Sequence, residues 1–235
     1  RKNLDLKKIV MANTPIFLNF LFSGLTLLTC IWFWIATGKR NFIAIYLIGL
    51  LCFQAVLGYS GFYLQSDALP PRIMFLLLPS VAGMMFAFGT EQGKQWIAQI
   101  DLRSYTALHV IRIPGEITIY YLFAEKLMPE SMTFAGRNFD ILSGITAPII
   151  AWYAWKDGKI NTQLLLCWNL LCLLLVLQVV GTGILSAPSP FQQLSFAQPN
   201  RAVLYFPYVW LPSIVVPVVL FGHFISFYRI LKKKG

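Results

Sequence analysis

Charged residues are scarce in this sequence. Asp, Glu, Lys and Arg make up 12% of its 235 residues and hydrophobic residues 57%, whereas soluble domains average about 25% charged residues. So few charges cannot cover a water-facing surface, which excludes an ordinary soluble domain and predicts an exterior that faces lipid. The net charge of +10 comes from lysines and arginines in short loops and at both ends, where such residues orient membrane spans. Nucleic acid is therefore not an expected partner.

Motifs of several enzyme classes are also missing. The sequence has no P-loop, no HExxH, no GxSxG turn and no histidine-rich box of a di-iron enzyme. Its cysteines form no CxxC motif, and all lie in apolar runs, so we expect buried apolar side chains and no disulfide or metal site. They are Cys30, Cys52, Cys167 and Cys172. No cleavable signal peptide is expected, because the first apolar run is too long for one.

What the sequence does have is long apolar runs. A run of about 20 residues crosses a hydrocarbon core of about 30 Å, and seven such runs recur between charged or turn-forming segments. The sequence thus predicts an all-α, polytopic integral membrane protein, a bundle of about seven transmembrane helices that forms a single transmembrane domain over residues 1–235. The predicted spans lie near 15–37, 42–64, 71–90, 103–126, 139–156, 164–187 and 208–231. Residues 91–101 predict a short amphipathic segment on the cytoplasmic face.

Lysine and arginine are unevenly divided between the two sides of this arrangement. One side has ten: Lys39, Arg40, Lys94, Arg103, Lys156, Lys159, Arg229, Lys232, Lys233 and Lys234. The other has four, apart from the N-terminal tail: Arg72, Lys126, Arg137 and Arg201. Because basic loops stay in the cytoplasm, we expect a cytoplasmic C-terminus in a plasma or inner membrane. The basic tail (Arg1, Lys2, Lys7 and Lys8) contradicts this, unless Met11 is the start or one span is miscounted.

The span at 103–126 carries Arg112 and Glu116 near its middle. A charge at this depth costs from about 2.5 to more than 10 kcal/mol, so it predicts a functional site. The polar residues of this span recur every three or four positions: Tyr105, His109, Arg112, Glu116 and Tyr120. They share one helix face, which must point into the bundle because lipid cannot satisfy polar groups. Arg112 and Glu116 are close enough to pair with each other, and Pro114 between them predicts a kink.

Two histidines on different spans are a second feature. His109 and His223 lie six residues inside Arg103 and Arg229, so at about 1.5 Å per residue they share a depth. Such a pair suits haem ligation, a proton relay or a structural hydrogen bond. Too few further ligands accompany them for a metal site, so no metal is predicted.

Other polar residues near the site have simpler expected roles. Gln54, Asn169 and Gln178 are candidate partners for Arg112 and Glu116. At the start of the fifth span, Asn138 or Asp140 is expected to cap the helix. The connection at 186–207 is too apolar for a solvated loop, so we expect a partly re-entrant segment or a lid over the outer mouth.

The sequence favours a protein that binds or transports a small solute. Arg112 would hold an anionic or carbonyl group and Glu116 would accept a coupling proton, with His109 and His223 connecting this site to the cytoplasm. Two alternatives remain open: a haem or quinone redox protein or enzyme that uses the histidines, and a non-catalytic subunit of a membrane complex. The expected partners are the lipid bilayer and a small molecule; the cofactor, and whether the chain forms a homo-oligomer, stay open.

Overall fold

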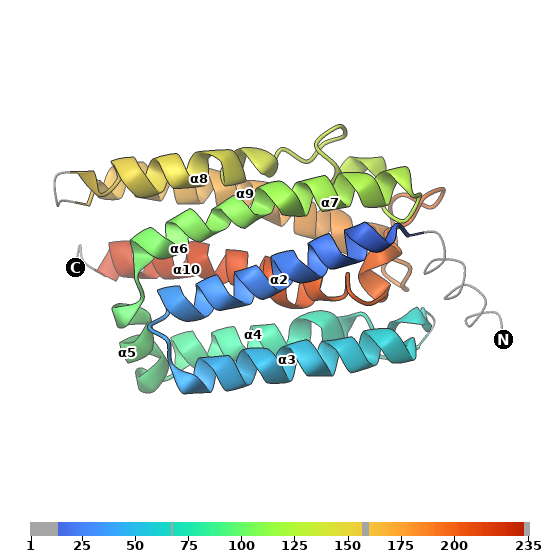
Figure 1. The fold of residues 1–235 in the computed structure, drawn as a ribbon, viewed down its shortest axis with the longest axis horizontal. Coiled ribbons are helices and arrows are strands. Elements are labelled where there is room, and N and C mark those ends of the chain that lie inside the picture. Colours follow the sequence, from blue (N-terminus) through green and yellow to red (C-terminus); the bar gives the residue numbers. More distant parts are fainter. Residues whose placement is uncertain (1–13, 67, 157–159, 233–235) are drawn as a thin grey trace.

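The computed structural model describes residues 14–66, 68–156 and 160–232, which are helical with connecting loops and contain no strand. The long helices run side by side along one axis, and the short helix α5 crosses one end of the bundle (Figure 1). Some of the basic residues on which the expected orientation depends lie outside the described residues: the N-terminal tail, Lys159, Lys233 and Lys234.

Helices occupy all seven regions in which apolar runs predict spans. The first three regions form α2 (Ile16–Ala36), α3 (Asn41–Ser60) and α4 (Met74–Gly89), which is followed by α5 (Glu91–Gln99). The fourth is divided into α6 (Leu102–Leu108), a 3-10 turn η2 (His109–Ile111) and α7 (Arg112–Ala124). The last three form α8 (Ile141–Tyr153), α9 (Thr162–Ser186), and a π-helical turn η6 (Leu211–Val215) that continues into α10 (Val216–Lys232).

Four helical segments in the described part of the chain are long and apolar enough to cross a membrane: α2, α3, α9 and Leu211–Lys232. A fifth is added if α4 and α5, which meet at an angle of 91°, count as one broken span. Helix α8 is apolar but has only 13 residues. The number of seven spans therefore stays a prediction.

The sharp turn between α4 and α5 has a local cause. Thr90 caps α5, since its hydroxyl accepts the N–H of Gly93 at 3.0 Å. A Cβ on Gly93 would lie 2.4 Å from the carbonyl oxygen of Ala87, so only glycine allows α5 to fold back this closely. This turn places α5 across the end of the helices, as the amphipathic pattern of residues 91–101 predicts.

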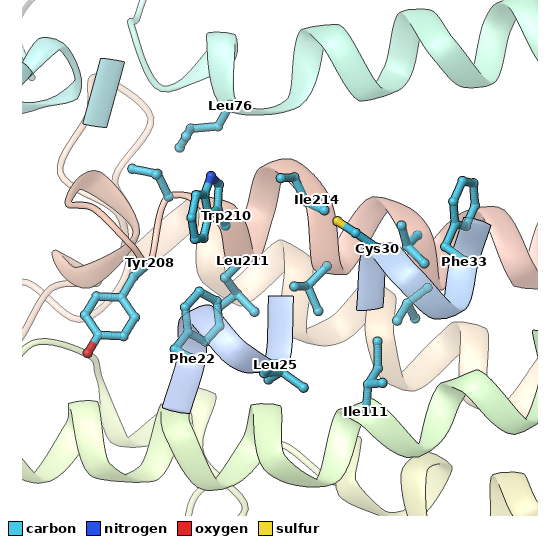
Figure 2. Close-up of a cluster of buried hydrophobic side chains, with 14 of the residues drawn as sticks. Phe22, Leu25, Cys30, Phe33, Leu76, Ile111, Tyr208, Trp210, Leu211 and Ile214 are labelled. Carbon is cyan, nitrogen blue, oxygen red and sulfur yellow. The ribbon is translucent and has the colours of Figure 1, made fainter. Parts of the chain in front are cut away.

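The main hydrophobic core joins α2 to the segment that leads into α10. Phe22 and Leu25 of α2 lie beside Leu211, and the cluster continues to Leu76 of α4 on one side and to Ile111 of η2 on the other (Figure 2). Farther along α2, Phe33 packs against Phe221. The outward faces are also apolar. Exposed side chains include Phe20, Ile45, Val56 and Leu171, each more than 60% exposed. Apolar patches of this extent are rare on soluble monomers and typical of lipid-facing or interface surfaces.

The connection before η6 packs against the end of the bundle opposite to α5 (Figure 1). Asn200 donates its N–H to the carbonyl of Ser186 at 2.8 Å, and Arg201 donates to Leu127 at 2.9 Å. Gln198 donates its side-chain amide to Met128 at 2.6 Å. Residues 199–205 are mostly buried as a result, and this segment brings Asn200 toward the polar residues of α7.

Candidate functional site: a buried polar network

An ion pair between two helices forms the centre of the network. The Nε of Arg112 donates to Oδ2 of Asp140 at 2.8 Å, and its NH2 group lies 2.6 Å from Oδ1. Both side chains are at least 94% buried. A two-point contact of this kind is the strongest arrangement of guanidinium and carboxylate, so it ties the start of α7 to the start of α8.

This pair corrects two expectations from the sequence. Within the described residues the only ion pair of Arg112 is with Asp140, and none forms with Glu116. Asp140 precedes α8 but makes no side-chain bond to that helix's backbone, so the expected cap is wrong. The physical reason is that Arg112 reaches across to α8, where a carboxylate can engage both arms of the guanidinium. Gly144 allows this approach, since a Cβ there would lie 3.0 Å from the nitrogen of Ile113.

His223 continues the network from α10. Its Nδ1 lies 2.8 Å from Oδ1 of Asn169, and its Nε2 lies 3.4 Å from NH1 of Arg112. Arginine can only donate, so Nε2 accepts and Nδ1 carries the hydrogen, which Asn169 accepts. The hydrogen-bond partners thus assign a neutral imidazole to His223.

His109 lies against His223 with a separation of 4.4 Å between the ring centroids. The ring of Trp168 packs edge-on against His109, with 5.4 Å between the ring centroids. The indole N–H of Trp168 donates to the hydroxyl of Thr146 at 2.9 Å, which fixes the position of the ring. His109 is 1% exposed, and its Nδ1 has no hydrogen-bond partner. The histidines therefore do meet, as their shared depth predicts.

Glu116 has a different partner from the one expected. Its Oε2 accepts the side-chain amide of Asn138 at 2.6 Å, and that amide also donates to the carbonyl of Met132 at 2.8 Å. The amide oxygen of Asn138 in turn accepts the N–H of Asp140 at 2.9 Å. Asn138 therefore links the two acidic residues, although the sequence indicated only a capping role for it.

A cavity of about 100 Å³ lies beside this network. Arg112, Glu116, Asp140 and Asn200 line it together with apolar side chains from α4, η2, α7, α9 and the segment that leads into α10. Asn200 is 1% exposed, and its side-chain oxygen has no hydrogen-bond partner. The cavity thus combines apolar walls with a few polar groups, the usual composition of a small-molecule site.

Comparison with known proteins places the chain in a family without naming an activity. Residues 70–231, more than half of the chain, match the family model described as Domain of unknown function (DUF8737). The chain belongs to this family. No curated protein and no solved structure matches it. The DUF8737 region begins after α3 and contains the whole polar network.

Several residues predicted for the site lie elsewhere. Gln54 lies outside the DUF8737 region, on α3, where it donates to Phe75 and accepts from Tyr63. Gln178 is exposed on α9 and donates to Arg137 at 2.9 Å. The structure does not bring either glutamine to Arg112.

The two tyrosines of the predicted stripe are also apart from the cavity. Tyr105 is buried, and its hydroxyl donates to Val218 at 2.7 Å. Tyr120 is 38% exposed and stacks on Phe134. The stripe therefore supplies His109, Arg112 and Glu116 to the network.

Asn138, Asp140 and Asn200 are the residues that sequence reasoning did not assign to the site. A buried arginine requires an acidic partner, and Asp140, at the start of the next predicted span, is a nearby acidic residue that this rule could have identified. In the described part of the DUF8737 region, no three His, Cys, Asp or Glu side chains come together as metal ligands.

Proposed function

We propose that the chain is an integral membrane protein that binds or transports a small solute in the cavity beside Glu116, with Glu116 as the proton-exchanging group. One observation carries this proposal. Glu116 is buried and lines the cavity, yet it forms no ion pair with any described residue because Asp140 occupies the guanidinium of Arg112.

The charges favour a cation over the anion expected from the sequence. Arg112 and Asp140 neutralise each other, so an ionised Glu116 would leave one net negative charge at the cavity. An uncompensated carboxylate is strongly disfavoured away from water. It therefore exchanges between a bound proton and a bound cation, whereas the positive charge that would attract an anionic solute is already neutralised by Asp140.

Asn200, which lines the cavity, supports the same ligand class. Its side-chain oxygen accepts no hydrogen bond from the described residues. This oxygen and the ionised carboxylate of Glu116 can both accept hydrogen bonds from a ligand, and neither can donate one. A volume of about 100 Å³ holds roughly three water-sized groups, at about 30 Å³ each. Ammonium, a small primary amine or an alkali cation fits these limits.

Membrane location and orientation belong to the same proposal. Its support is the set of long apolar helices and the exposed apolar side chains on their outer faces. We place the C-terminus in the cytoplasm of a plasma or inner membrane on the distribution of basic loops.

The haem alternative is less compatible with the histidine geometry. A metal held between two imidazoles lies about 2 Å from each nitrogen, so the nitrogens would be about 4 Å apart and the ring centroids farther still. The centroids of His109 and His223 are 4.4 Å apart, which leaves no room for a haem between the rings.

Infrared spectroscopy of the purified full-length chain tests the proposal. We expect a carbonyl band from a protonated carboxyl group in the wild type, its absence in Glu116→Gln, and its decrease as ammonium or sodium is added. Glu125→Gln makes the same change at the end of α7 and should leave the band in place. A band that persists in Glu116→Gln, or that no cation reduces, would contradict the proposal; a decrease with acetate alone would favour the anionic ligand instead.

A further inference from the structure

A second pocket, larger than the cavity at Glu116, has no role in the proposed function. It has a volume of about 700 Å³ and lies where α3, α4, α5 and α10 meet, near the end of the bundle that α5 crosses. We propose that this pocket binds one anionic membrane lipid, whose acyl chain lies in the pocket and whose headgroup lies at Arg40.

Its volume and walls suit an acyl chain. The volume falls within the roughly 300–1,000 Å³ typical of small-molecule sites. The walls are almost wholly apolar, with Phe33, Leu47, Leu50 and Phe221 at the back. Such walls match an acyl chain in polarity, so a chain can leave the surrounding leaflet for the pocket without exposing hydrocarbon to water.

The polar groups inside the pocket are already satisfied. The hydroxyl of Tyr46 donates to the carbonyl of Pro79 at 2.9 Å, and that of Ser80 donates to Ser213. Neither hydroxyl has a hydrogen left to donate to a ligand, and the other lining side chains of the interior are apolar, so the interior favours hydrocarbon.

The rim has the opposite character. Arg40 is the one charged residue that lines the pocket within the described chain, and three glutamines of α5 (Gln92, Gln95 and Gln99) accompany it. All four are exposed, and Arg40 donates to Gln99. No acid lines the pocket, so the rim carries one positive charge and several neutral donors, which complements a phosphate headgroup.

The pocket also opens toward the outer surface between α3 and α4. Phe42, Tyr46 and Phe86 line it and are 53%, 39% and 54% exposed. On the proposed membrane location, that surface faces lipid, so a lipid of the surrounding leaflet can enter sideways without crossing water. Trp96 of α5 stacks on Phe221 and donates its N–H to Thr37 at 3.1 Å, and tryptophan is enriched at the headgroup level of membranes.

This pocket is separate from the cavity at Glu116. Ile214, Pro217 and Val218 line the lipid pocket, whereas Val215 and Val219 line the cavity. The segment of η6 and α10 therefore separates the two sites, with one site on each face. A protein that binds no lipid in the pocket could still bind a cation at Glu116.

Native mass spectrometry of the full chain in mixed micelles tests the inference. With equal amounts of phosphatidylglycerol and phosphatidylcholine, we expect one retained lipid and a preference for phosphatidylglycerol. Arg40→Gln should reduce that preference about fivefold, the effect of one basic residue on anionic-lipid binding. Lys39→Gln removes a charge from the adjacent residue, which does not line the pocket, and should leave the preference unchanged.

A second pair of variants tests the pocket itself. Met84→Trp fills the space, since Met84 lines the pocket, and should lower retention of both lipids. Met85→Trp adds the same side chain at the next position of α4, which is 71% exposed, and should retain lipid as the wild type does. The inference is overturned if the wild type retains no lipid, if Arg40→Gln and Lys39→Gln behave alike, or if Met85→Trp lowers retention as much as Met84→Trp.

Discussion

Replacing Asp140 by asparagine should be one of the most destabilising conservative changes in this protein. The substitution keeps the shape of the side chain and removes its charge, which leaves the guanidinium of Arg112 buried without a counter-ion. The remaining acceptors, Nε2 of His223 and the carbonyl of Cys172, each lie 3.4 Å away and are too distant to compensate. Loss of one partner of a buried pair costs about 3–5 kcal/mol, so we expect Asp140→Asn to lower the free energy of unfolding by that amount.

Glu116→Gln is the matched comparison, because it removes the other buried acid of the same network. A glutamine oxygen can still accept from Asn138, so the change should stay within about 1 kcal/mol. Replacing both members of the pair, in Arg112→Met with Asp140→Leu, should restore most of the stability, since apolar substitution of a whole buried pair is often neutral or better.

Denaturant unfolding in mixed micelles, followed by far-UV circular dichroism, measures all three variants. If Glu116→Gln destabilises more than Asp140→Asn, then Arg112 pairs with Glu116 as the sequence first suggested. A loss below about 1 kcal/mol for Asp140→Asn, the range of an exposed pair, would also refute the reasoning.

Two further predictions concern the histidines. Gly222→Ala would place a Cβ 2.5 Å from a ring carbon of Tyr105 and 2.9 Å from Nε2 of His109. Overpacking of this kind should lower the free energy of unfolding by about 1–3 kcal/mol. An unchanged free energy of unfolding would contradict the close approach of these helices. Asn169→Leu leaves the N–H of His223 without its acceptor, so we expect a loss of about 1–3 kcal/mol. The same unfolding assay measures this loss. If Asn169→Leu is as stable as the wild type, His223 has another tautomer or another hydrogen-bond partner.

The sequence predicts the helices well because long apolar runs are a strong signal. The expected runs at 15–37 and 164–187 correspond to α2 (Ile16–Ala36) and α9 (Thr162–Ser186). Helix α8 (Ile141–Tyr153) is shorter than the expected 139–156 at both ends. At its start, residues 139 and 140 belong to the loop that carries Asp140, so this boundary differs where the chain builds the ion pair.

The site was predictable mainly within one helical segment. Helical spacing brought His109, Arg112 and Glu116 to one face, and burial of all three follows from that pattern. Across helices, only the shared depth of His109 and His223 indicated a contact. The acidic partner of Arg112 comes from another segment, which spacing along the chain does not identify. Asp140 had the same local signature as an ordinary cap, because it directly precedes a helix.

On the proposed membrane location, the ion pair between α7 and α8 has a consequence for how the protein would enter a membrane. Helices α6, α7 and α8 have 7, 13 and 13 residues, each too short to span a membrane alone. Arg112 also remains uncompensated until Asp140, 28 residues later, has been synthesised. Translocation machinery would therefore meet two weak segments whose charges cancel only when they lie together. We expect them to be inserted as one helical hairpin, in a single step of biogenesis.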